Sequence, residues 1–171
     1  GHADAIMSSF EYIKNNPRKF HEGEIGQLFD FDDWPVRRYL DSGVSTLIRL
    51  SFEKRATESD LRERAKSLFR AYYNYLRKWG WYWDHVAEID VDNFISPDVA
   101  LRFRTKLLEV VPRDKLIPIW HEVRGEDGWH EMCNEFPYVG IGSDITFGAA
   151  SMWEYYNHLV AYAHSRGCIV H

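Results

Sequence analysis

The sequence predicts an α/β protein that resembles an incomplete (β/α) TIM barrel of about six strand–helix units. Short apolar segments alternate with longer segments of helical periodicity, which is the pattern of a parallel sheet with crossover helices. The apolar segments are nearly uninterrupted, as expected of strands that are covered on both faces. No GxGxxG turn follows the first apolar segment, which favours a barrel over an open nucleotide-binding sheet.

The length of the chain limits how complete such a barrel can be. An eight-fold barrel typically needs about 250 residues, and this chain has 171. We therefore expect a truncated piece, a degenerate barrel or a smaller α/β sheet. Residues 1–2 look like the remnant of a tag, and residues 3–171 are expected to form a single domain.

The first half of the chain contains two expected strands and one strong helix. Residues 3–10 are strand-like, and residues 36–43 form a second strand that ends in an Asp-Ser-Gly turn. Residues 57–80 have the spacing of an amphipathic helix, with a capping box at the start and Gly80 at the end. Residues 11–20 have only weak helical spacing, and Pro17 interrupts it.

The second half repeats the strand–helix order more regularly. A third strand runs through Val86 to Ile89, and a helix follows that Ser96 can cap, with Pro97 at its first position. The remaining expected elements are a strand at 115–123, a helix at 127–136, a strand at 138–144, a helix at 150–167 and a strand at 168–171.

Composition and charge restrict the class of protein. The chain is 45% hydrophobic, carries a net charge of −5 and has no polybasic stripe. It has no apolar run of the roughly 18 residues that a membrane span needs and no signal peptide, so we expect a cytoplasmic protein that does not bind membranes. Cys133 and Cys168 lack metal-binding spacing and are expected to be buried, reduced thiols.

Polar or glycine residues follow five of the expected strands. They are Asp41-Ser42-Gly43, Asp90, His121-Glu122, Gly142-Ser143-Asp144 and His171. In a (β/α) barrel the carboxyl ends of the strands converge on the face that carries the active site. We therefore expect Asp41, Asp90, His121, Ser143 and His171 to share one cleft.

The order of four short motifs resembles the queuine tRNA-ribosyltransferase family and its phage relatives, the DNA guanine transglycosylases. The motifs are "YLDSG", "AEID", "IPIWH" and "YVGIG", and they extend over most of residues 3–171. The resemblance implies exchange of guanine for a 7-deazaguanine base in nucleic acid, with DNA favoured over tRNA. It implies no cofactor and, without the zinc-binding cysteine cluster of the tRNA enzymes, no metal.

The resemblance also implies roles for individual residues. Asp41 matches the aspartate that acts as general acid/base, and with His121 it forms the catalytic pair that we predict. The remaining predicted residues contact the base, and they are Ser42, Gly43, Asp90, Gly140, Gly142, Ser143 and His171. The nucleophilic aspartate of the family belongs to a strand beyond the sixth, so no residue of this chain is matched to it.

Two alternatives remain open at the level of the sequence. Asp, His and Glu at strand ends also build metal-dependent hydrolases. A partial barrel could instead bind a base or a protein partner without catalysis. Exposed aromatic residues on the helix at 57–79 and an unclosed sheet edge predict self-association.

Overall fold

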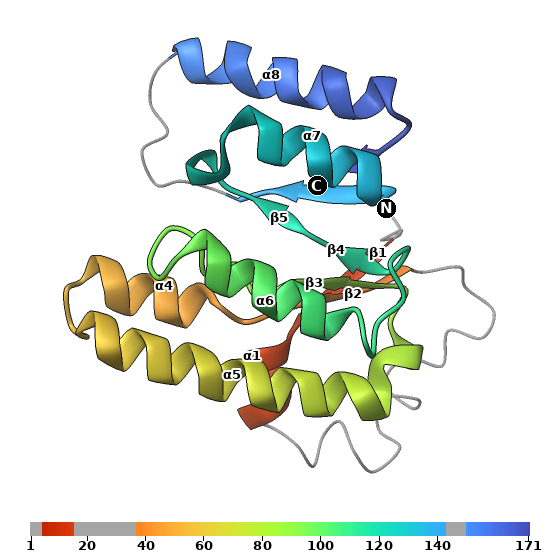
Figure 1. The fold of residues 1–171 in the computed structure, drawn as a ribbon. Coiled ribbons are helices and arrows are strands. Elements are labelled where there is room, and N and C mark those ends of the chain that lie inside the picture. Colours follow the sequence, from red (N-terminus) through yellow and green to blue (C-terminus); the bar gives the residue numbers. More distant parts are fainter. Residues whose placement is uncertain (1–4, 16–36, 143–149) are drawn as a thin grey trace.

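The computed structural model describes residues 5–15, 37–142 and 150–171, in which parallel strands alternate with helices (Figure 1). The strands are β1 (Ala5–Ser9), β2 (Arg37–Asp41), β3 (His85–Ala87), β4 (Leu116–Ile117), β5 (Ile119–Trp120), β6 (Tyr138–Ile141) and β7 (Ile169–Val170). The helices are α1 (Phe10–Asn15), α4 (Ser45–Phe52), α5 (Glu58–Trp79), α6 (Pro97–Leu107), α7 (Gly125–Glu135) and α8 (Ala150–Ser165), with 3-10 turns η1 (Gly80–Tyr82) and η2 (Glu122–Arg124).

The predicted TIM-barrel-like fold is wrong, because the described strands form two small sheets and do not close. β1, β2, β3 and β4 pair in that order in one parallel sheet, and β5, β6 and β7 pair in a second. Pro118 divides the single strand expected at 115–123 into β4 and β5, since proline has no N–H to donate to a neighbouring strand. β4, β5 and β7 are only two residues long, and among the described strands no ladder joins β1 to β7 or β4 to β5.

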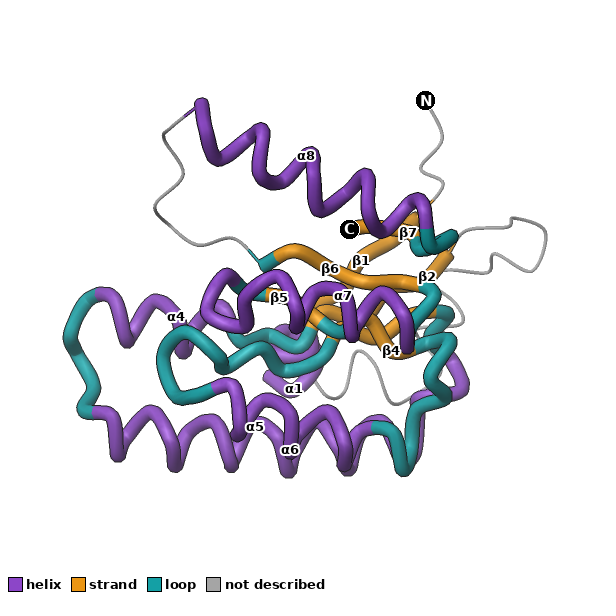
Figure 2. The backbone as a smooth tube through the Cα atoms, turned by 45° about the horizontal axis from the view of Figure 1, so that its top comes forward, coloured by secondary structure: helices purple, strands orange, loops and turns teal. Residues whose placement is uncertain are grey.

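The two sheets meet at Pro118. Its carbonyl accepts a hydrogen bond of 2.8 Å from the amide of Gly140 in β6, while the carbonyl of Ile117 accepts one of 3.0 Å from the amide of Glu88. Figures 1 and 2 show α5 and α6 on one side of the strands and α7 and α8 on the other. The strands therefore lie between two layers of helices.

The two helix starts that the sequence predicted most clearly are confirmed. The amide of Asp60 donates to Thr57 Oγ1 at 3.1 Å, and the amide of Thr57 donates to the Asp60 carboxylate at 3.1 Å, which completes the capping box of α5. Ser96 caps α6 by accepting from the amide of Val99 at 3.3 Å.

Helix α4 is an element that the sequence analysis missed. It begins at Ser45, directly after the Asp-Ser-Gly turn, where only a turn was expected. The apolar residues Val44, Leu47 and Ile48 have helical spacing, and the first two are buried. This short helix matters for function because it lies over the end of β2.

Tryptophan side chains join α7 and α8 to the strands. The buried rings of Trp120 and Trp129 meet edge to face with centroids 5.8 Å apart, and Trp129 donates to the carbonyl of Leu159 in α8 at 2.9 Å. Cys133 and Cys168 are both free and buried, as predicted. None of the described helices has both the length and the apolar character to cross a membrane.

Candidate functional site

Two carboxylates from different strand ends line one cavity of about 230 Å³. Asp41 is the last residue of β2, and Asp90 follows β3 by three positions. His171, directly after β7, lies on the same cavity. The other lining residues are mostly apolar, and they are Met7, Tyr39, Leu40, Val44, Ser45, Ile48, Ala87, Ile117 and Ile119.

Aromatic rings stand side by side at one wall of this cavity. Tyr39 lines the cavity and stacks on His85, with ring centroids 5.1 Å apart and an interplanar angle of 25°. Tyr138 of β6 meets the edges of both rings, at 4.9 Å from His85 and 6.0 Å from Tyr39. Of these three rings only Tyr39 lines the cavity, and His85 and Tyr138 support it from behind. The cavity therefore combines one supported aromatic ring with two carboxylates, which suits a flat ligand that carries N–H groups.

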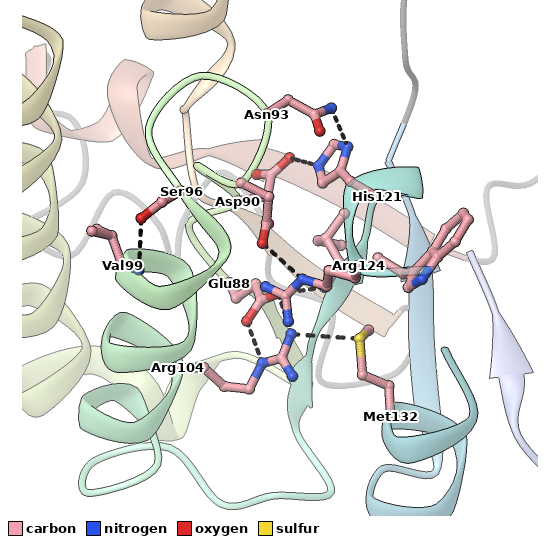
Figure 3. A network of polar contacts seen from close by, with 12 residues as sticks. Glu88, Asp90, Asn93, Ser96, Val99, Arg104, His121, Arg124 and Met132 are labelled. Carbon is pink, nitrogen blue, oxygen red and sulfur yellow. Dashed lines mark hydrogen bonds and ion pairs between the residues drawn. The ribbon is translucent and has the colours of Figure 1, made fainter. Parts of the chain in front are cut away.

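Asp90 is held by His121, the residue that the sequence placed at the end of the fourth strand (Figure 3). His121 Nε2 lies 3.1 Å from Asp90 Oδ2, and His121 Nδ1 lies 2.9 Å from the side-chain nitrogen of Asn93. The imidazole is buried and faces a second, smaller cavity of about 70 Å³ that Asp90 and Asn93 also line. Burial raises the pKa of Asp90, and the contact with His121 offsets part of that effect.

Gly142 makes room for this imidazole. A Cβ atom at residue 142 would overlap the ring of His121, so only glycine fits beside it. A Cβ at Gly140 would lie 2.5 Å from Cδ1 of Ile119, which is a residue of the cavity wall. Both glycines thus shape the surroundings of the cavity through their neighbours, whereas the sequence analysis had assigned them to direct contact with a base.

The Asp-Ser-Gly turn is held by its own aspartate. Asp41 Oδ2 accepts a hydrogen bond of 3.1 Å from the amide of Gly43, and Gly43 has φ +75°, a conformation that favours glycine. Ser42 is only 1% exposed, and its hydroxyl has no hydrogen-bond partner among the described residues. Ser42 and Gly43 do not line the cavity that contains Asp41.

A buried ion-pair network next to this site escaped the sequence analysis. Arg104 of α6 donates to both carboxylate oxygens of Glu88, at 2.7 and 2.8 Å, and the amide of Ile119 donates to the same carboxylate at 2.7 Å (Figure 3). Arg124 donates to Asp92 at 2.7 Å. Burial raises the pKa of Asp92, and the pairing with Arg124 lowers it in part. The alternation of acids in "EIDVD", residues 88–92, was a signal that could have found this network.

The structure thus gathers some of the predicted site residues and separates others. Asp41, Asp90 and His171 share the cavity, and His121 reaches it through Asp90. Ser143 lies outside the described residues. Within the described part of the chain, no three His, Cys, Asp or Glu side chains are grouped so that they could hold a metal ion.

No protein-family model, curated protein or solved structure matches the chain. The resemblance to the tRNA-ribosyltransferase family therefore remains an expectation from short motifs. The geometry of the cavity at Asp41 and Asp90 is the ground on which a function can be proposed.

Proposed function

We propose that the cavity between Asp41 and Asp90 binds a guanine-like base, and that the protein exchanges guanine for a 7-deazaguanine in nucleic acid. The observation that carries this proposal is that two carboxylates from separate strand ends line one largely apolar cavity. Its volume of about 230 Å³ is below the range of roughly 300–1,000 Å³ for drug-sized ligands, so it suits a single heterocyclic base.

The chemistry of the lining supports a base of this kind. A guanine edge offers several N–H donors, and an ionised carboxylate only accepts hydrogen bonds, so Asp90 is suited to recognise that edge. Tyr39, backed by the stacked ring of His85, offers an aromatic surface beside the base. Neutral apolar neighbours such as Ile117 and Ile119 exclude water and strengthen these polar contacts.

Base exchange would proceed in two displacements at the anomeric carbon. In such an exchange a nucleophilic carboxylate displaces guanine, and the incoming 7-deazaguanine then displaces that carboxylate. We assign this nucleophile to no described residue, because Asp41 and Asp90, the two carboxylates of the cavity, have other roles. We assign Asp41 to proton transfer: it gives a proton to the departing guanine and takes one from the incoming base. Asp90 recognises the base in both steps, and His121 acts as a positioning residue that orients the Asp90 carboxylate.

We further propose that DNA is favoured over tRNA as the substrate, that the protein is cytoplasmic and that the chain self-associates. Trp81, which is 70% exposed beside the largely buried Trp83, gives self-association a candidate contact. A metal-dependent hydrolase and a non-catalytic base-binding protein remain the alternatives, and no described contact favours either.

Calorimetric titration with guanine and with a 7-deazaguanine tests the binding step. We expect the wild-type protein to bind both bases and Asp90→Asn to bind them at least tenfold more weakly, because an amide offers one acceptor fewer and presents a donor instead. Asp114→Asn, which removes an exposed carboxylate away from the cavity, is the matched control and should bind as wild type does.

Incorporation of radiolabelled guanine into DNA and into tRNA tests the chemistry. Incorporation into either polymer supports exchange and identifies the substrate. Binding of guanine without incorporation would favour the non-catalytic alternative. If the wild-type protein binds neither base, the proposal is wrong.

A further inference from the structure

A second cavity, of about 250 Å³, lies between α1, α4 and α5 and is not explained by base binding. Lys14 comes from α1, Thr46 from α4, and Arg64 and Ser67 from α5. These residues supply two cations and two hydroxyl groups, and none of the described lining residues is acidic. In a chain whose net charge is −5, a cavity with this lining is suited to an anion.

Among the described residues, the two cations of this cavity have no ion-pair partner within 4 Å. Other basic residues on the surface of α5 are neutralised: Arg62 pairs with Glu58 at 2.7 Å, and Lys66 pairs with Glu63 at 2.7 Å. Neither Lys14 nor Arg64 forms an ion pair with any described residue.

The acidic group that interacts electrostatically with Arg64 is Asp60, and its carboxylate is already hydrogen-bonded to Thr57 at 2.7 and 3.1 Å. Both cations of the cavity are exposed, so their side chains can turn toward a bound group. The cationic side chains of Lys14 and Arg64 are therefore placed where an anionic ligand could contact them.

One turn separates this cavity from the proposed base cavity. Asp41, Val44 and Ser45 line the base cavity, whereas Gly43 and Thr46 line the cationic one. Ser42 belongs to the same turn, and its buried hydroxyl has no partner in the part of the chain that the structure describes. The two cavities therefore lie on the two sides of one short turn. This arrangement suits a ligand whose base enters the first cavity while its backbone contacts the second.

We propose that the cavity of Lys14, Arg64, Thr46 and Ser67 binds a phosphate group of a nucleic-acid backbone, next to the nucleotide whose base enters the neighbouring cavity. This inference rests on the proposed function for the choice of nucleic acid as the source of the phosphate. Lys14 and Arg64 neutralise the phosphate charge, and the Ser67 hydroxyl donates a hydrogen bond to one of its oxygens.

Binding of a fluorescein-labelled single-stranded oligodeoxynucleotide of twelve nucleotides, with one central guanine, tests this site at several salt concentrations. The double variant Lys14→Gln/Arg64→Gln should bind it about tenfold more weakly. Its slope of log affinity against log salt should be shallower by about 0.7 for one lost phosphate contact. The double variant Arg62→Gln/Lys66→Gln removes the same charge from paired positions of α5 and should bind within about twofold of wild type.

Two further measurements separate this site from the base cavity. The Lys14→Gln/Arg64→Gln variant should bind free guanine as wild type does, whereas Asp90→Asn should lose guanine. Inorganic phosphate at millimolar concentration should compete only weakly with the oligonucleotide. Equal losses in the two double variants would overturn the phosphate site, because general surface charge would then explain binding.

Inorganic phosphate that binds as tightly as the oligonucleotide would overturn the assignment to a nucleic-acid backbone, since the cavity would then take a small free anion. Failure of the wild-type protein to bind guanine would overturn the base cavity alone. The salt slopes of the two double variants would still decide whether Lys14 and Arg64 contact a phosphate.

Discussion

Glu88 and Asp90 stand two residues apart after the same strand, yet the structure gives them opposite environments. Glu88 is fully buried, and its carboxylate accepts two hydrogen bonds from Arg104 and one from the amide of Ile119. Asp90 is also largely buried, but its partner is the imidazole of His121, and the carboxylate faces a cavity. The partner of an acid at a strand end therefore indicates its role. An arginine that occupies the carboxylate indicates a structural acid, and a carboxylate that still faces a cavity indicates a binding residue.

The comparison has a physical basis. A buried carboxylate that receives a bidentate arginine has its charge neutralised and its lone pairs occupied, so little capacity remains for a ligand. A carboxylate whose pKa is raised by burial keeps an unfavourable charge, which a ligand with N–H donors could stabilise. Glu88 is therefore expected to determine stability, and Asp90 to determine binding.

The largest effect on stability is expected for Glu88→Gln. The substitution leaves the buried guanidinium of Arg104 without its counter-charge, and breaking a buried pair in this way costs about 3–5 kcal/mol. Urea unfolding measures the loss. Glu135→Gln, which breaks an exposed pair with Arg113, is the control and should cost less than about 1 kcal/mol. Equal losses in the two variants would contradict the structural role of Glu88.

A smaller loss is expected for Gly142→Ala. The added methyl group overlaps the ring of His121, and such overpacking costs about 1–3 kcal/mol. Because His121 holds Asp90, guanine binding should weaken as well. Gly80→Ala is the control: its φ is −58° and the new Cβ would lie 3.8 Å from its nearest neighbour, so the variant should unfold within about 0.5 kcal/mol of wild type. Normal guanine binding by Gly142→Ala would show that the position of His121 does not matter for Asp90.

The next prediction concerns the pH dependence of stability in Asp90→Asn. The pKa of Asp90 is raised by folding, so the folded protein holds this proton more tightly than the unfolded chain does. This contribution to stability is complete below the pKa of an aspartate in the unfolded chain, about 3.9, and is lost as pH rises through the folded pKa. The stability of wild type minus that of Asp90→Asn should therefore fall as pH rises from about 4 toward neutral, in urea unfolding at each pH. Asp92 contributes in the same direction to both proteins and cancels in the difference.

A difference that stays constant with pH, or rises, would contradict that prediction. Asp114→Asn, compared with wild type over the same pH values, controls for the removal of an exposed carboxylate. If the stability difference between wild type and Asp90→Asn does not fall with pH, the raised pKa of Asp90 no longer distinguishes it from Glu88. The position of Asp90 on the cavity would remain as the difference between the two acids.

The elements of the fold could be predicted from local patterns, and the way they assemble could not. The capping box at Thr57 and the cap at Ser96 depend on neighbouring residues, so their sequence signals are reliable. Closure of a barrel depends on strand length and pairing over long distances, and Pro118 changed both. The end of the second strand was predicted correctly at Asp41, whereas β3 ends at Ala87, three residues before Asp90. The partners of these residues come from distant segments and left little trace in the sequence.

The roles of Gly142 and Arg104 depend on contacts between distant segments and could not be predicted from the sequence. The sequence analysis assigned Gly142 to a base-binding turn. In the structure a Cβ at this position would overlap the ring of His121, which lies 21 positions earlier in the chain. Arg104 is typical of an exposed helix position by residue type, yet it is buried against Glu88. Both assignments require knowledge of which segments pack together, and spacing within one segment does not contain it.

The smallest effect on the fold is expected for Asp41→Asn, and it gives the sharpest test of function. The asparagine side-chain oxygen can still accept the hydrogen bond from the amide of Gly43, so the turn should persist and stability should stay within about 0.5 kcal/mol of wild type. An amide transfers no proton, so base exchange should be abolished, while guanine binding weakens only modestly because Asp90 is intact. Urea unfolding, guanine titration and radiolabelled-guanine exchange measure the three quantities on one preparation. If Asp41→Asn destabilises the protein as Glu88→Gln does and leaves guanine binding unchanged, Asp41 belongs with the structural acids, and the transglycosylase proposal should be dropped.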